Sequence, residues 1–138
     1  MSEEASNVAV LKDAYQKWRS SKGEPEHFMC LVDPAIQFGS LADGKEPLTF
    51  ARAYEGRDAL NQYFKGLGAE WTMVDYVTDE FVAQGESVVM RGSCQWKNNR
   101  TGKVMKTPKL DFWRMRNGRA VEFYEFYDTA AAGIAATD

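Results

Sequence analysis

The chain has 138 residues and a mass of 15.6 kDa, and 44% of its residues are hydrophobic. This length and composition suit a single domain over residues 1–138 with a substantial core, and they argue against a disordered or fibrous protein. The net charge of -3 argues against a nucleic-acid partner. No apolar run approaches the roughly 20 residues that span a bilayer, and the N-terminal residues lack the features of an export signal. We therefore expect a cytoplasmic protein with no membrane partner.

The sequence offers little to hold a metal ion. His27 is the only histidine, and the two cysteines, Cys30 and Cys94, lie in apolar contexts without the spacing of zinc ligands. We predict two buried free thiols, no metal site and no organic cofactor.

The N-terminal segment is predicted to form a helix. Ser6 or Asn7 can cap it, and Gly23 can end it. Tyr15 and Trp18 continue an apolar face at helical spacing, so both side chains should point inward.

A short helix, a short strand and a long connection are predicted next. Residues 25–31 suit the helix, because Pro25 fits a first helical turn. Residues 35–41 form the strand. Residues 42–56 form a connection of the length that often borders a binding site, with Tyr54 as a candidate rim residue.

Residues 57–67 are predicted to form a third helix. Tyr63 and Phe64 belong to its apolar face, and Gly66 and Gly68 are expected to end it.

From Trp71 the apolar spacing changes from helical to alternating. Residues 71–83 are predicted to form one long strand or two short ones, followed by strands over residues 88–97 and 103–116. Alternation within residues 88–97 predicts four inward residues: Met90, Gly92, Cys94 and Trp96.

Asn117-Gly118 joins two aromatic arms and predicts a β-hairpin. A two-residue turn would place Asp111 opposite Tyr124. A three-residue turn with Gly118 in the left-handed conformation would place Asp111 opposite Phe123. We prefer the second register, which also sets Trp113 opposite Val121 and Lys109 opposite Glu125.

In the preferred register Asp111 and Glu125 point toward an aromatic face that contains Trp113 and Phe123. Burial there would raise the pKa of a carboxyl group, as acid-base catalysts require. The alternative is structural: Asp111 lies at the sheet edge, and Lys109 and Glu125 form a surface pair. The opposite face carries three aromatic residues that favour a dimer: Phe112, Tyr124 and Phe126.

Residues 130–138 are small and offer little to bury, so we expect a frayed tail. Three helices followed by antiparallel strands indicate the α+β class.

The helical start, the helix GRDALNQYF and the ending LDFWRMRNGRAVEFYEFYD resemble the nuclear transport factor 2-like superfamily. Within it, the SnoaL-like polyketide cyclase and ketosteroid isomerase group is most similar, over residues 8–129. The resemblance implies a cone: a strongly curved antiparallel sheet wrapped around three N-terminal helices, with an internal pocket. It also implies a homodimer formed through the outer face of the sheet.

The resemblance also implies roles for individual residues. Tyr15 and a neutral Asp111 match the oxyanion hole of ketosteroid isomerase, and Glu125 matches an acid-base aspartate of SnoaL-like cyclases. The isomerase's own base is matched by Gly39, or by Ser40 if the match shifts by one, and neither is a carboxylate. Seven residues are predicted to contact the substrate: Trp18, Tyr54, Tyr63, Phe64, Trp113, Phe123 and Lys109.

Three functions are compatible with these residues. The first is an enzyme that performs isomerisation, cyclisation or dehydration of a small apolar carbonyl compound by acid-base chemistry, with Asp111, Tyr15 and Glu125 as catalytic residues. The second is a non-catalytic domain that binds a small apolar ligand in the same pocket. The third is a dimeric association domain.

Overall fold

Alternating apolar and polar residues build the strands of the chain into one curved sheet. A computed structural model describes residues 2–138, in which six strands are ordered β2-β1-β6-β5-β4-β3. The elements in chain order are α1 (Glu3–Ser20), α2 (Glu26–Met29), β1 (Val32–Ser40), β2 (Tyr54–Glu55), α3 (Arg57–Glu70), β3 (Trp71–Gln84), β4 (Ser87–Asn98), β5 (Val104–Arg116), β6 (Arg119–Tyr127) and α4 (Thr129–Ala135).

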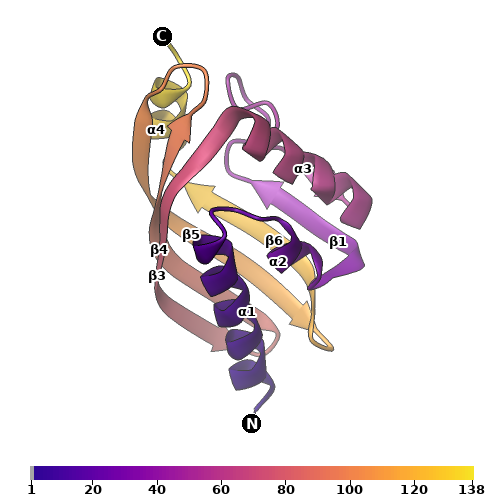
Figure 1. Cartoon of the computed structure of the whole chain (residues 1–138). Coiled ribbons are helices and arrows are strands. Elements are labelled where there is room, and N and C mark those ends of the chain that lie inside the picture. The colour runs from indigo at the N-terminus through magenta and orange to yellow at the C-terminus, as the bar shows by residue number, and fades with distance from the viewer. Residues whose placement is uncertain (1) are drawn as a thin grey trace.

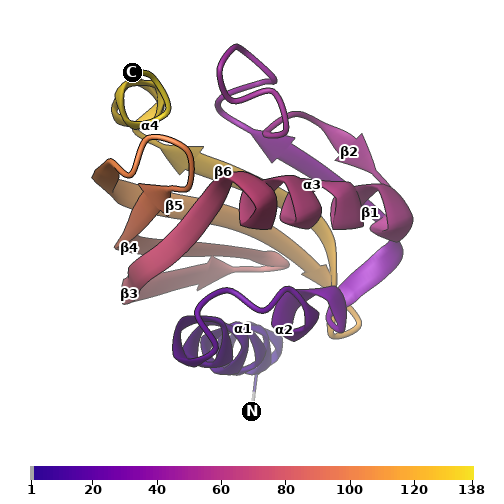
Figure 2. The same cartoon turned by 45° about the horizontal axis from the view of Figure 1, so that its top comes forward.

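The helices α1, α2 and α3 lie on one side of the sheet, which curves around them (Figures 1 and 2). Neighbouring strands run antiparallel, except that β1 and β6 pair in parallel. The predicted α+β architecture of a curved sheet wrapped around three N-terminal helices is therefore confirmed.

Helix α1 begins earlier than the sequence predicts. The side chain of Ser2 accepts a hydrogen bond from the backbone N–H of Ala5 at 3.1 Å, so Ser2 is the N-cap in place of Ser6 or Asn7. The acidic residues of the first turn suit the positive end of the helix dipole. The helix ends near Gly23 as predicted, since the N–H of Gly23 reaches back to the carbonyl oxygen of Trp18 at 2.9 Å.

Helix α3 passes through both glycines that were expected to end it. A Cβ atom at Gly66 would lie 2.6 Å from the Cβ atom of Phe50, so this glycine allows the connection 42–53 to approach the helix closely. A Cβ atom at Gly68 would meet nothing within 4 Å. The prediction was wrong because a glycine within a helix can allow another segment to pack closely and need not end the helix.

Strand β3 is one long strand with two irregularities, between Met73 and Asp75 and between Thr78 and Glu80. On its partner β4, a Cβ atom at Gly92 would lie 1.9 Å from the carbonyl oxygen of Val77. The sheet bends where the two backbones approach this closely, and only glycine leaves room for it.

The β5–β6 hairpin forms at Asn117-Gly118 with the two-residue turn of our alternative, while the preferred three-residue turn was wrong and neither register gave the partner of Asp111. Both turn residues have positive φ values, 53° and 76°, and Arg116 pairs with Arg119, which is a two-residue turn. An irregularity then follows at Val121, between the pairs Met115–Ala120 and Arg114–Glu122.

As a result Asp111 lies opposite Glu125, and Trp113 lies opposite Phe123. The preferred register differs from the observed one by two residues here. Because side chains alternate with period two, that error leaves both carboxylates on the inner face. The rings of Trp113 and Phe123 stack there with their centroids 3.9 Å apart.

Residues 129–135 form helix α4 instead of the expected frayed tail. The side chain of Asp128 caps the helix by accepting a hydrogen bond from the N–H of Ala131 at 3.0 Å. Ala132 and Ala135 are buried, and a guanidinium N–H of Arg100 donates to the carbonyl oxygen of Ala136 at 2.7 Å. The small side chains that suggested fraying instead allow close packing against the end of the sheet.

The outer face of the sheet carries the expected aromatic residues. Phe126 is 39% exposed, and the rings of Tyr124 and Phe126 lie 4.8 Å apart. The dimer through this face stays a prediction. Cys94 is buried as expected but Cys30 is exposed, because it follows the short helix α2 at the surface. Among residues 2–138, no helix is long and apolar enough to cross a membrane.

Replacing Gly92 tests the close approach of β3 and β4. Gly92→Ala should lower the free energy of unfolding by about 3 kcal/mol, because the new methyl group has no space without backbone movement. Gly68→Ala is the matched control and should raise it by about 0.4–1 kcal/mol. Urea unfolding measures both. Equal effects of the two substitutions would contradict the packing described for Gly92.

Candidate functional site

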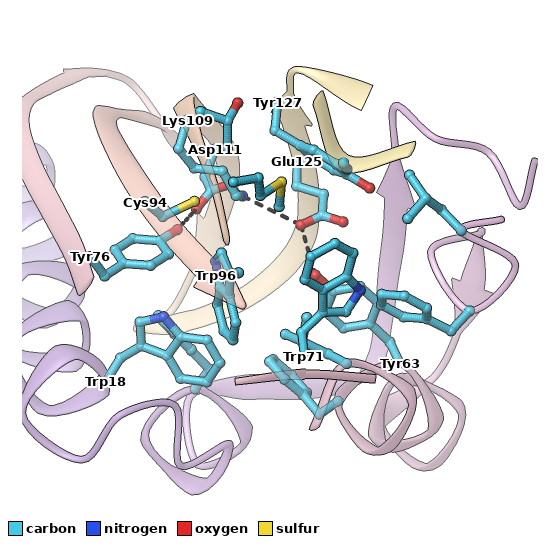
Figure 3. A pocket seen from close by; sticks show the side chains of 18 of the residues that line it. Trp18, Tyr63, Trp71, Tyr76, Cys94, Trp96, Lys109, Asp111, Glu125 and Tyr127 are labelled. Carbon is cyan, nitrogen blue, oxygen red and sulfur yellow. Dashed lines mark hydrogen bonds and ion pairs between the residues drawn. The ribbon is translucent and has the colours of Figure 1, made fainter. Parts of the chain in front are cut away.

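The inner face of the sheet and the helices border a cavity of about 60 Å³ (Figure 3). A single water needs about 10–15 Å³ of such space, so the cavity has room for a small organic molecule. Most of its lining is aromatic or aliphatic. These lining residues are Trp18, Phe28, Leu48, Phe50, Tyr63, Phe64, Leu67, Trp71, Tyr76, Cys94, Trp96, Met105, Phe123, Tyr127 and Ala132.

Three charged side chains lie together on the cavity wall. Lys109 and Asp111 are two residues apart on β5 and so share its inner face, and Glu125 lies opposite Asp111 on β6. The side-chain ammonium of Lys109 contacts Oδ1 of Asp111 and lies 3.4 Å from Oε1 of Glu125. The three residues are 8%, 1% and 3% exposed, respectively. We call Lys109, Asp111 and Glu125 the charged triad.

The two carboxylates of the charged triad keep Lys109 protonated. Burial alone would lower the pKa of Lys109, but the nearby carboxylates of Asp111 and Glu125 outweigh it and hold this pKa above its usual range. Lys109 is therefore a cation and a hydrogen-bond donor, and it does not provide a free amine for nucleophilic attack.

Asp111 is held from the other side by two tyrosines. The hydroxyl of Tyr15 donates to Oδ2 of Asp111 at 2.5 Å, and the hydroxyl of Tyr76 lies 3.3 Å from the same oxygen. The indole N–H of Trp113 donates to the hydroxyl oxygen of Tyr15 at 2.8 Å. Trp113 and Tyr15 thus form a hydrogen-bonded chain, outside the lining of the cavity, that orients Asp111.

Glu125 accepts hydrogen bonds from two hydroxyl groups. Tyr63 donates to Oε1 and Ser40 donates to Oε2, each at 2.7 Å. Of the two residues that match the isomerase base, only Ser40 therefore contacts a residue of the charged triad. Gly39 faces the other side of the sheet, where an added Cβ atom would lie 2.4 Å from the ring of Tyr124.

The other titratable groups of the lining stay neutral near pH 7. Burial, followed by the charge of the nearby carboxylate, raises the pKa values of Tyr63 and Tyr76 well above their ordinary value. Burial also raises the pKa of Cys94, to about 11, and that of Tyr127. Their hydroxyl and thiol groups keep their protons, so the charged triad alone sets the charge of the cavity.

Seven of the ten predicted site residues line the cavity: Trp18, Tyr63, Phe64, Lys109, Asp111, Phe123 and Glu125. Tyr15, Tyr54 and Trp113 do not. Tyr15 and Trp113 lie behind Asp111, and the hydroxyl of Tyr54 donates to the carbonyl oxygen of Phe50 at 2.8 Å.

Sequence reasoning left out several residues of the site. Trp96 was predicted to face inward by alternation but was not assigned to the site, and Trp71 and Tyr76 were not assigned either. The irregularities of β3 interrupt the alternation on both sides of Tyr76, so no simple pattern marks it. Ser40 could be found only through its match to the isomerase base.

No metal-ligand cluster is found within residues 2–138: no three His, Cys, Asp or Glu side chains there lie close enough to hold an ion. The polar groups of the cavity instead bond one another.

The comparisons agree on one kind of fold. A sequence model of the SnoaL-like domain matches residues 12–123. An NTF2-like protein of unknown function from Burkholderia pseudomallei is similar with a TM-score of 0.85 and 22% identity, over 100% of both chains. An NTF2-like protein from Burkholderia thailandensis has a TM-score of 0.80 and 25% identity, over 96% of this chain and 98% of its own.

A protein from Jannaschia, named as a SnoaL-like polyketide cyclase, has a TM-score of 0.77 and 16% identity, over 99% of this chain and 95% of its own. A search of curated proteins found no match. The similar structures show the shared fold and leave the activity to be argued from the site itself.

Removing the ammonium group tests the charged triad. Lys109→Met should lower the free energy of unfolding by about 3–5 kcal/mol, because it leaves two buried carboxylates without their cation. Arg116→Met is the control, since Arg116 pairs with Glu86 at the surface and should contribute little. Denaturant unfolding at neutral pH compares them. Similar losses in the two variants would show that the triad is not effectively buried.

The raised pKa of Cys94 predicts a loss of stability in alkali. Between the ordinary value of 9.0 and about 11, the unfolded chain releases the thiol proton while the folded chain keeps it. Unfolding therefore becomes more favourable as the pH rises through this range. Unfolding free energies measured at intervals from pH 8 to 11 should fall less steeply in Cys94→Ala. Parallel curves would indicate that the thiol is open to solvent.

Proposed function

The chain belongs to the SnoaL-like domain family, and from this premise we propose that its cavity performs cofactor-free acid-base chemistry on a small apolar carbonyl compound. The observation that carries the proposal is the position of Lys109, between two buried carboxylates on the wall of an aromatic cavity. Donor and acceptor groups then lie side by side at one end of an apolar site.

Glu125 is the proposed base. A carboxylate has about four acceptor positions, and Glu125 accepts hydrogen bonds at two of them, from Tyr63 and Ser40. Acceptor capacity is therefore left for a substrate proton. Lys109 contacts Asp111 directly but lies 3.4 Å from Glu125, so Glu125 is the less neutralised of the two carboxylates and the better proton acceptor.

Lys109 and Tyr76 are the proposed donors to the carbonyl oxygen. An ammonium group has three N–H donors, and Lys109 donates one of them to Asp111 while lying 3.4 Å from Oε1 of Glu125. Tyr76 lines the cavity, and its 3.3 Å hydrogen bond to Asp111 is long enough to be exchanged for one to a ligand. Tyr15 is a positioning residue, because its hydroxyl is directed at Asp111.

The proposed step is balanced without a cofactor. Glu125 takes a proton from the carbon next to the carbonyl group, and the C–H electron pair moves to the carbonyl oxygen, where Lys109 stabilises the new negative charge. Return of the proton to another carbon gives isomerisation. Loss of a β-hydroxyl group as water gives dehydration, and attack of the enolate on a second carbonyl gives cyclisation.

This assignment differs from the roles that the resemblance implied. Asp111 was expected to be a neutral donor, but the contact with Lys109 and the hydroxyl of Tyr15 both favour an acceptor. The ammonium of Lys109 takes over the donor role in our proposal. Ser40 supports Glu125 through its hydroxyl group in place of supplying a base of its own.

A second candidate is ligand binding without chemistry. It is favoured by the hydroxyl groups of Tyr63 and Ser40, because their hydrogen bonds occupy acceptor positions of Glu125 that a base would offer to a substrate. The two candidates share the cavity and differ in whether a proton is removed.

Exchange of carbon-bound protons for deuterium tests the proposal without knowledge of the product. Cyclopentanone, cyclohexanone and acetophenone would be incubated with the protein in D₂O and followed by proton NMR. Glu125→Gln should slow the protein-dependent exchange by about 10²–10⁴-fold, the usual contribution of a general base.

Glu122→Gln is the matched control on the same strand, since Glu122 pairs with Arg114 on the outer face and should be dispensable. Exchange that is equally fast in Glu125→Gln would disprove the role of Glu125. Saturable binding of the ketones with no exchange would favour the second candidate.

A further inference from the structure

We propose that the ligand of this cavity is a small organic cation: an alkylammonium ion with apolar substituents. The inference rests on the proposed function in one respect, because the same cavity takes the ligand. It goes beyond the small apolar carbonyl compound proposed above, because it adds a positively charged group to the ligand.

The charges on the cavity wall do not balance. Asp111 and Glu125 supply two negative charges and Lys109 supplies one positive charge, while the tyrosines and Cys94 of the lining are neutral. One negative charge is therefore not compensated. All three side chains are more than nine-tenths buried, and a buried charge without a counter-ion is unfavourable.

The unbalanced charge lies at Glu125. Lys109 contacts Asp111, and Tyr15 holds the other oxygen of Asp111, so that carboxylate has its counter-charge. Glu125 is 3.4 Å from Lys109 and otherwise accepts from neutral hydroxyl groups only. Glu125 lines the cavity, so a cation bound there would complete the charge balance.

The cavity also has an aromatic wall. Trp18, Trp71 and Trp96 all line the cavity, and Figure 3 shows Trp18 on the opposite side of the view from the charged triad. The ring of Trp18 lies 6.2 Å from that of Trp96 and 6.3 Å from that of Tyr76. The electron-rich faces of indole and phenol rings attract cations, most strongly in a site without water.

An anionic ligand is disfavoured by the same features, since it would add negative charge beside Glu125 and against the ring faces. A neutral ligand would fit the apolar wall but leave the charge of Glu125 uncompensated. A cation with methyl or methylene substituents satisfies both the carboxylate and the rings, and the cavity volume of about 60 Å³ admits one of a few heavy atoms.

Three ligands of one shape test the inference. Choline is a cation, 3,3-dimethyl-1-butanol is its neutral isostere, and 3,3-dimethylbutanoate is a related anion. Calorimetric titration of the wild-type protein should show choline binding at least about tenfold more tightly than the alcohol, with the anion weakest. This comparison needs no variant.

Two variants locate the effect and one controls for it. Glu125→Gln removes the unbalanced charge and should bring choline and the alcohol to within about threefold of each other. Trp71→Leu should weaken choline more than the alcohol, because it removes a ring face. Glu122→Gln removes an outer-face carboxylate and should change neither. Thermal melting confirms that each variant is folded.

The alcohol binding as tightly as choline would overturn the inference, as would no binding of choline at concentrations up to about 10 mM. An equal loss of choline binding in Glu122→Gln would also overturn it, because it would indicate general surface attraction. If deuterium exchange of the ketones depends on Glu125 but choline does not bind, this inference is disproved and the proposed acid-base step is not. Choline binding with no exchange would disprove the acid-base step alone.

Discussion

The structure depends on three charges buried side by side between β5 and β6. Lys109, Asp111 and Glu125 could not lie in an apolar interior singly, because each ion would lose its hydration without compensation. Together they are held by one ion pair in direct contact, one longer ion pair and hydroxyl donors from four other elements. The hairpin register, the placement of α1 and α3 and the chemistry of the cavity all follow from satisfying these groups.

The register of the β5–β6 hairpin brings the three buried charges together. The two-residue turn alone would set Asp111 opposite Tyr124, whose side chain belongs to the outer face. One extra residue at Val121 shifts the pairing so that Asp111 lies opposite Glu125. The irregularity therefore does more than bend the strand, because it brings two carboxylates within reach of one ammonium group.

Much of the fold could be predicted because it rests on local rules. Asn117-Gly118 predicts a hairpin from two residues, and alternation predicts the inner face of β4. Asp111 and Glu125 were assigned to the correct face from an incorrect register, because the error was an even number of residues. The ends of α3 and the tail were predicted wrongly, since Gly66 and the C-terminal alanines are small in order to pack against distant segments.

The site was less predictable, because its hydrogen bonds join residues far apart in the chain. Tyr15 and Asp111 are 96 positions apart, and Ser40 and Glu125 are 85 apart. The sequence could name Tyr15 as an aromatic residue on an inner face. It could not show that Trp113 donates to the hydroxyl of Tyr15 and Tyr15 donates to Asp111, so that in our proposal Lys109 and Tyr76 are the donors to the ligand. In our proposal a hydroxyl group at Ser40, where an isomerase has its base, leaves Glu125 as the base. The negative charge that would act on a ligand then lies on β6 in place of β1, within the same fold.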